Sequence, residues 1–387
     1  MQISESTPDH EIVQKAMEMT GKTCRYAQTM SSGQTTDASE TAMCLARGLL
    51  RMIEVNEQQQ QQQQQQQHKR HHLTMQYIVQ EYRVWSRSQP LEKGKLMSSI
   101  DKGEDVEKIR QNAYQENKHV QSEMDELGVT TNGSLVRVMP LIVYALRLPP
   151  DKTFNLIRLE SSLTHASYVV YYAVTAYALT AQYLIRFPSQ CGRHRHAIKF
   201  AQEFLQMQHR IADDPQKHTR AISEIERWIG DAISIAKSSE SNSPRSTRSK
   251  VWSKDRAKLK TAHSKLVPTH LKISLQLAFY HLYIANSFQQ AIEDTLSFGG
   301  AANSNCCVVG GLMGAFHGVD HFRTFKAKID NWKPSQGVTT AANRAPYQAK
   351  HYADYLPLLL KFALHPRDYA VDDNFYSCDK TFAEFIM

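Results

Sequence analysis

Apolar residues recur at helical spacing along most of the chain, and no segment alternates apolar and polar residues as a strand does. The segment that follows Gly33 illustrates the pattern. Asp37 or Ser39 caps a helix there, and its apolar face consists of Ala42, Ala46, Leu49, Leu50 and Ile53. Since the other long segments repeat this spacing, the sequence predicts an all-α fold.

The most apolar segment, residues 166–185, contains about twenty residues without a charge, which is long enough to cross a membrane. It also carries serine, threonine and glutamine side chains and five tyrosines, and other apolar helices lie near it in the sequence. These features favour a buried central helix, so no membrane partner is expected. Thr164 is a candidate N-cap for this helix, and His165 would then lie in its first turn.

A second distinctive segment is residues 296–318, LSFGGAANSNCCVVGGLMGAFHG. Gly299 and Gly300 suit a backbone turn, and the polar residues at 303–305 are candidate caps for a helix that begins at Cys306. Glycines inside that helix cost roughly 1 kcal/mol each, so a neighbouring element should pack closely against them. The segment is interpreted either as a tightly packed core helix or as a helix N-terminus directed at an anion or a metal.

The rest of the chain is organised around this helical core. A short amphipathic helix is expected at His10–Met19. We expect residues 1–322 to form a single domain, with a polyglutamine insertion at 58–67 and a disordered serine-rich loop at 238–250. Residues 323–387 are expected to form an irregular C-terminal tail.

Composition and charge narrow the possible function. The chain has 387 residues and a formal net charge of +8, but the positive charges are spread over loops and tails, so no nucleic-acid partner is predicted. The six cysteines lack zinc-site spacing and suit free thiols in a reducing compartment. The chain does not open with a signal peptide, which favours a cytoplasmic location and leaves a nuclear one open.

Four segments in order carry a specific resemblance: GQTTDASETAMCLARGLL, NGSLVRVMPL, SLTHAS, and AFYHLYIANSFQQAIEDTLSFGGAANSNCCVVGGLMGAFHG. Over roughly residues 8–321 the chain resembles the ADP-ribosylglycohydrolase family. The resemblance implies a large orthogonal helical bundle with a pair of Mg²⁺ or Mn²⁺ ions at its centre. Members of that family hydrolyse the glycosidic bond between ADP-ribose and a protein side chain or a related acceptor.

The metal motifs of the resembled family are degenerate in this chain. The family uses Thr-Asp-Asp at the start of an early helix and Asp-x-Asp-Thr or Asp-x-Asp-Ser after paired glycines, where this chain has Thr36-Asp37-Ala38 and Ala301-Ala302-Asn303-Ser304. Only one of the four expected metal carboxylates is therefore present, that of Asp37. The remaining candidate ligands are the neutral oxygens of Thr36, Asn303 and Ser304. Because affinity for divalent cations depends on the number of charged ligands, we expect the Mg²⁺ site to be weakened or lost.

The resemblance also implies a ligand site that does not depend on the metal. The residues expected along ADP-ribose are Asn132, Gly133, Ser134, His165, Gly299 and Gly300. The helix with which family members usually begin is missing here unless the true start lies upstream of Met1, and its loss would remove one wall of the site. We expect a catalytically impaired protein that binds ADP-ribose or ADP-ribosylated protein. The alternative is an active Mg²⁺-dependent hydrolase in which Asp37 is catalytic. The sequence does not indicate the linkage, the acceptor or the oligomeric state.

Overall fold

The structure is a computed structural model and describes residues 33–62, 71–72, 74–94, 97–124, 130–211, 215–240, 248–263, 266–332, 344–363 and 369–370. The helix expected at His10–Met19 lies outside these residues. The first half of the described chain contains the helices α2 (Asp37–Gln62), α3 (Gln76–Arg87), α4 (Ser98–Lys102), α5 (Val106–Met124), α6 (Met139–Tyr144), α7 (Pro150–Ser161) and α8 (Tyr168–Arg186). The second half contains α9 (Arg193–Ile211), α10 (Pro215–Glu240), α11 (Arg248–His263), α12 (Leu271–Tyr283), α13 (Phe288–Phe298), α14 (Ala302–His317), α15 (Arg323–Asp330) and α17 (Tyr352–Lys361).

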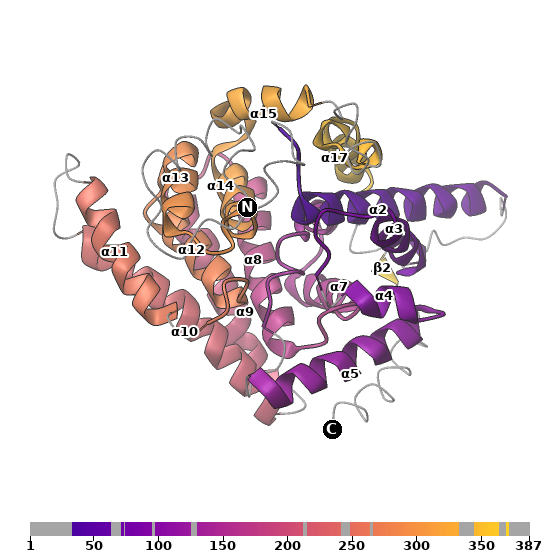
Figure 1. Cartoon of the computed structure of the whole chain (residues 1–387), viewed down its shortest axis with the longest axis horizontal. Helices are drawn as coiled ribbons and strands as arrows, with labels where there is room; N and C mark the ends of the chain where they lie inside the picture. The colour runs from indigo at the N-terminus through magenta and orange to yellow at the C-terminus, as the bar shows by residue number, and fades with distance from the viewer. Residues whose placement is uncertain are drawn as a thin grey trace.

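Helices make up nearly all of the regular structure in the described residues (Figure 1). Three short 3₁₀ segments, η3 (Val319–Phe322), η4 (Ala345–Tyr347) and η5 (Ala349–His351), join the last helices. Two-residue strands β1 (His71–His72) and β2 (Tyr369–Ala370) pair in parallel. The all-α fold predicted from helical spacing is confirmed, since this single short strand pair leaves the helical architecture unchanged.

Helix α8 is the buried centre of the bundle (Figure 1). Fifteen of its nineteen residues are buried, and it packs against α7, α9, α10 and α14. The prediction of a buried central helix is therefore confirmed, and among the described helices none is long and apolar enough to cross a membrane. The predicted cap was wrong, because Ser167 occupies the N-cap position, while the Thr164 hydroxyl accepts a hydrogen bond from Arg137.

Helix α14 packs against α12, α13 and α8, as its small residues require. A Cβ placed on Gly311 would lie 2.5 Å from the Tyr177 hydroxyl oxygen, which confirms the close packing expected against the glycines at this position. The predicted start of the helix was wrong. It begins at Ala302, Ala301 is the N-cap, and no side chain caps it, so Asn303 and Ser304 lie in its first turn.

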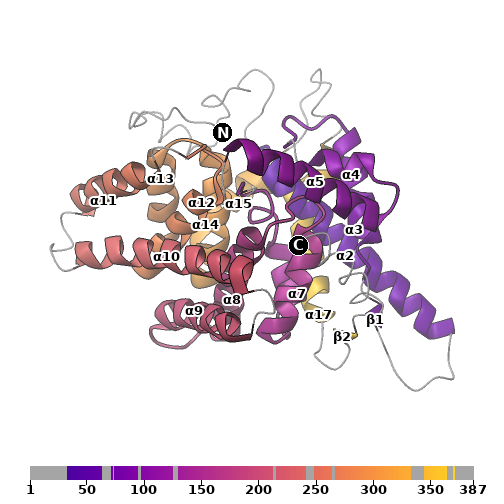
Figure 2. The same ribbon diagram turned by 90° about the horizontal axis from the view of Figure 1, so that it is seen from below.

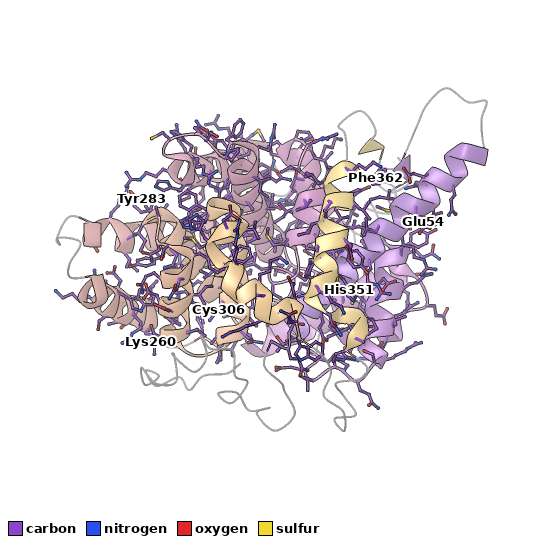
Figure 3. All side chains as sticks on the ribbon, turned by 90° about the horizontal axis from the view of Figure 1, so that it is seen from above. Glu54, Lys260, Tyr283, Cys306, His351 and Phe362 are labelled. Carbon is purple, nitrogen blue, oxygen red and sulfur yellow. The ribbon has the colours of Figure 1, made fainter. Side chains whose placement is uncertain are left out.

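The peripheral segments differ from the sequence expectations in three places. The region expected to be an irregular tail contains α15 and α17, and α17, which lies between the labelled residues His351 and Phe362 in Figure 3, packs against α2 and α6. Helix α2 continues into the glutamine tract as far as Gln62, and helices α10 and α11 extend into both ends of the serine-rich segment (Figure 2). The centre of that segment, residues 241–247, lies outside the described residues. Four cysteines lie in the described part of the chain and are free thiols, as predicted.

Candidate functional site

The N-terminal turns of α2 and α14 meet at a cavity of about 310 Å³. The loop before α6 and the loop between α7 and α8 form other parts of its wall. The residues that line it are Asp37, Thr41, Trp85, Glu92, Gly94, Met97, Thr131, Asn132, Gly133, Val136, Arg137, His165, Thr269, Ala301, Asn303 and Ser304. Segments far apart in the sequence thus converge on one space. Its size falls at the small end of the range for ligand pockets.

Most of the site residues predicted from the sequence meet at this cavity. Six of them line it: Asp37, Asn132, Gly133, His165, Asn303 and Ser304. Thr36 adjoins the cavity, because its hydroxyl accepts a hydrogen bond of 3.4 Å from the Asn303 amide nitrogen. The two segments predicted to form a metal site are therefore neighbours in space, 267 positions apart in the sequence.

Three predicted ligand-binding residues do not line this cavity. Ser134 is fully buried, because the turn before α6 directs its side chain into the core. Gly299 and Gly300 both have positive φ, of 84° and 64°, and the turn they make places them in a second cavity that also contains Asn305. These two glycines therefore lie apart from the residues that line the larger cavity.

The side chains at the two motif segments do not fit a pair of divalent cations. Asp37 is the only carboxylate in the two segments, and Ala38 and Ala301 are buried with 3% and 2% exposure, so neither offers a ligand atom. Asn303 uses its amide nitrogen toward Thr36. Hard divalent cations are held by oxygen ligands, and their affinity rises with the number of charged ligands. Among the described residues no cluster of three or more histidine, cysteine or acidic side chains is arranged to hold a metal ion.

The Asp37 carboxyl group has an unusual electrostatic environment. Burial, and to a smaller extent the nearby carboxylate of Glu92, raise its pKa from 3.8 to about 6, although a hydrogen bond from the Ala38 backbone N–H opposes the change. Both effects disfavour the charged form. The surroundings of Asp37 thus disfavour its negative charge. The two motif segments also provide no second carboxylate that could bind a cation together with it.

A buried ion pair lies one helical turn beyond Asp37. Glu40 accepts hydrogen bonds of 2.7 Å from the Trp85 indole and 2.8 Å from Arg344, and both charged side chains are almost fully buried. Arg344 also donates to the backbone and hydroxyl oxygens of Ser88. This arrangement joins α2, α3 and the segment that begins at Arg344, so it fixes the first turn of α2 at the cavity.

Arg137 organises the loop that forms one wall of the cavity. Its guanidinium donates to the carboxylate of Glu160 at 2.7 Å, to the backbone oxygen of Gly133 at 2.8 Å and to the Thr164 hydroxyl at 2.8 Å. The ion pair with Glu160 is buried, with exposures of 2% and 0%. Because three of its donors are already engaged, Arg137 serves mainly to hold the loops at 133 and 164 in place.

His165 is held between two hydroxyl groups. Its Nδ1 lies 2.7 Å from the Thr164 oxygen and its Nε2 lies 2.9 Å from the Thr131 oxygen. Thr164 accepts from Arg137 and keeps its own proton to donate, and in the tautomer in which it donates to Nδ1, Nε2–H donates to Thr131. Burial and the adjacent Arg137 hold the pKa of His165 well below its usual range, so the ring is neutral at pH 7.

Gly133 permits the close approach of His165. A Cβ added to Gly133 would lie 2.7 Å from Cε1 and 2.9 Å from Nε2 of the imidazole. Real side chains do not tolerate such contacts, so residue 133 must be glycine for the ring to keep its position. Asn132 is fixed as well, because its backbone N–H donates to Thr269 and its amide nitrogen donates to the Ser274 hydroxyl at 2.7 Å.

Several cavity residues were not predicted from the sequence. Glu92 and Gly94 come from the turn after α3, which shows only a turn signal. Trp85 and Thr41 belong to apolar helix faces, and Thr269 comes from the loop before α12. No local motif marks these positions. The packing of α2 against α3 brings the α2 and α3 residues together, and the backbone hydrogen bond from Asn132 to Thr269 places the loop before α12 at the cavity.

The comparisons with known proteins point to one family. Residues 2–350 match the family described as ADP-ribosylglycohydrolase. The match covers about nine tenths of the 387 residues and includes all the segments that line the cavity. A search among curated proteins found no match to this chain.

Proposed function

Because this chain belongs to the ADP-ribosylglycohydrolase family, we propose that its cavity binds ADP-ribose or an ADP-ribosylated protein and that its hydrolytic turnover is impaired. Members of the family act on ADP-ribosylated substrates. The observation that carries the proposal is the direct hydrogen bond between Asn303 and Thr36. Two neutral side chains meet there, at the two segments that are rich in carboxylates in the family.

The small number of charged candidate metal ligands supports impaired turnover. A binuclear site acts as a Lewis acid and orients water only if its ligands hold both cations against their hydration shells. Asp37 is one carboxylate, and its pKa of about 6 reflects an environment that already disfavours negative charge. Neutral oxygens on Thr36, Asn303 and Ser304 complete the candidate set. Such a set gives far weaker cation binding than four carboxylates.

The polar wall of the cavity supports retained binding. Thr131, Asn132 and Ser304 line it, and none of these groups needs a metal ion in order to form hydrogen bonds. Helix α14 begins at the cavity with no side-chain cap, so N–H groups of its first turn are directed toward the region where a negatively charged diphosphate would lie. The loop at Gly133 and the His165 ring are held rigidly, which reduces the entropy cost of binding.

The test is calorimetric titration of ADP-ribose into the purified protein, with millimolar Mg²⁺ in one series and a chelator in the other. We expect the same affinity in both series. The alternative function, an active Mg²⁺-dependent hydrolase, predicts binding only in Mg²⁺ and release of ADP-ribose from a modified protein that Asp37→Ala abolishes. Absence of binding in both series would refute the proposed function.

A further inference from the structure

A second cavity of about 160 Å³ lies beside the first one and is formed by different residues. Its walls come from the end of α11, the start of α12, the end of α13 and the first turn of α14. The residues that line it are Lys260, His263, Leu266, Pro268, Ile273, Phe298, Gly299, Gly300 and Asn305. None of them lines the larger cavity.

His263 lines this second cavity and carries an acceptor without a partner among the described residues. Its Nε2 lies 2.6 Å from the Gln276 amide oxygen, and the Gln276 amide nitrogen donates to the backbone oxygen of Trp228 at 2.8 Å. The Gln276 oxygen therefore accepts, Nε2 carries the proton, and Nδ1 has a lone pair. Nδ1 is buried and has no hydrogen-bond partner in the described part of the chain. Burial lowers the pKa of His263 to about 4, which keeps the ring neutral at pH 7.

Asn305 lines the same cavity and also carries a polar group without a partner in the part of the chain that the structure describes. The Ser274 hydroxyl accepts from Asn132 and donates to the Asn305 amide oxygen, with both distances at 2.7 Å. This chain of hydrogen bonds assigns the oxygen and leaves the Asn305 amide nitrogen as the group without a partner among the described residues. Asn305 is 1% exposed. A buried N–H₂ group without a partner is uncommon and requires an explanation.

The remaining walls are flat or apolar. The Phe298 ring lies edge-on to His263, with 5.8 Å between ring centroids, and Leu266 and Ile273 are apolar. Gly300 adds no side chain, and a Cβ there would approach Pro268. Lys260 lies over the Phe298 ring, and no carboxylate lines the cavity, so a cationic ligand is disfavoured. The lone pair of His263 disfavours an anion at the same point.

We propose that this second cavity binds a small planar ring that carries a hydrogen-bond donor beside an acceptor, as an aromatic primary amide or an amino-substituted heterocycle does. The ligand's acceptor receives a hydrogen bond from the Asn305 amide nitrogen, and its N–H donates to His263 Nδ1. The aromatic ring packs on Phe298 and the apolar side chains. This site is separate from the proposed ADP-ribose site and does not depend on it.

The probe is benzamide, a neutral planar ring with one donor beside one acceptor, and the matched control ligand is N,N-dimethylbenzamide, which has no donor. Titration into the full chain at pH 7.5 is expected to show benzamide binding that is at least tenfold tighter than that of the control ligand. ADP-ribose at saturation should leave this affinity unchanged. Displacement of benzamide by ADP-ribose would place it in the larger cavity and overturn the proposal, as would absence of binding at 10 mM.

Variants locate the site. His263→Phe removes the acceptor and keeps a ring, so benzamide affinity should fall at least tenfold, whereas His196→Phe on the exposed face of α9 should leave it unchanged. If His263→Phe fails to fold, the wild-type protein supplies a second measurement. The ¹⁵N resonance of His263 Nδ1 should have the position typical of a bare nitrogen and should shift when benzamide is added. An unchanged Nδ1 resonance at saturation would overturn the proposal and indicate that only ordered water satisfies these two groups.

Discussion

The amide nitrogen of Asn303 lies 3.4 Å from the hydroxyl oxygen of Thr36, so the first turns of α14 and α2 are joined by one neutral hydrogen bond. By the resemblance described above, these two turns are where the family has its metal motifs. Two carboxylates at these positions would repel each other unless a cation lay between them, whereas this neutral contact needs no cation. The buried alanines 38 and 301 therefore fit a site that is stable without metal.

Restoring the acidic residues should restore metal binding. In the triple variant Ala38→Asp, Ala301→Asp and Asn303→Asp, three carboxylates join Asp37 at the cavity. Without metal, each new buried charge costs about 1–3 kcal/mol or more, so the melting temperature should fall. Mg²⁺ should then raise it, because a ligand that binds only the folded state stabilises that state.

The control for this experiment is the same triple variant with Asp37→Asn added. It should lose most of the Mg²⁺-dependent rise in melting temperature, because one of the four carboxylates is neutralised. The wild-type protein should show no such rise at 10 mM Mg²⁺. If the triple variant also shows none, the two turns do not form the site that the resemblance implies.

Asp37 should make the protein less stable as pH rises from about 4 to about 6. Its pKa is raised from 3.8 to about 6 in the folded state, so the folded state binds more protons than the unfolded state within this window. The stabilisation that the protonated Asp37 side chain gives to the folded state is fully present below pH 4 and is lost as pH rises through 6. The free energy of unfolding falls by about 3 kcal/mol at most over this window.

The measurement is urea unfolding of the wild type and of Asp37→Asn between pH 4 and pH 8. The variant should gain about 2–3 kcal/mol relative to the wild type at pH 7.5 and little at pH 4, because its side chain stays neutral throughout. Taking the difference between the two proteins cancels the titration of all other groups that the substitution leaves unaffected. An equal difference at both pH values would show that the Asp37 pKa is not raised.

Gly133→Ala should damage the cavity through His165. The new Cβ would lie 2.7 Å from the imidazole, which Thr131 and Thr164 hold in place, so the ring or the loop must move. Overpacking of this kind costs about 1–3 kcal/mol. We expect a lower melting temperature and at least tenfold weaker ADP-ribose binding by calorimetry.

Gly94→Ala is the matched control, because Gly94 also lines the cavity but a Cβ there would meet nothing within 4 Å. Its melting temperature should stay within about 2 °C of the wild type, since surface substitutions change stability by about 0.5 kcal/mol or less. If both alanine variants behave alike, the contact between Gly133 and His165 does not determine the shape of the cavity.

The sequence predicted the parts of the fold that depend on local pattern. Apolar spacing identified the buried helix α8, and the small residues of α14 indicated its close packing, because both properties lie within one segment. The order of the motifs assigned Asp37, Asn132, His165 and Asn303 to one site, and all four line the larger cavity. The predicted caps failed, since capping depends on backbone geometry that tertiary packing sets.

Positions determined by packing between distant segments could not be predicted. Glu92 lines the cavity because the turn after α3 lies against that cavity. No residue near Glu92 in the sequence indicates this position. The two glycines at 299 and 300 carry a strong turn signal, but a turn signal does not say which side of the turn faces which cavity. The helices of the C-terminal segment were also missed, because their apolar faces are short.

Arg344→Met should destabilise the protein by about 3–5 kcal/mol, because removing one partner leaves the Glu40 carboxylate buried without its cation. The side chains of Arg344 and Glu40 are only 1% and 3% exposed. Arg323→Met is the matched control. It breaks an ion pair with Asp320 whose side chains are 77% and 70% exposed, and it should change stability by less than about 1 kcal/mol. Chemical unfolding at pH 7.5 measures both.

The double variant Glu40→Gln with Arg344→Met separates the ion pair from simple packing. If the loss in Arg344→Met arises from the uncompensated charge of Glu40, neutralising Glu40 should recover about half of it or more, a coupling of about 1.5–3 kcal/mol between neighbours. Burial already raises the pKa of Glu40. The single variant should therefore also lose less stability at pH 5 than at pH 7.5, as Glu40 takes up a proton. Additive losses at both pH values would show instead that Arg344 stabilises α2 through packing alone.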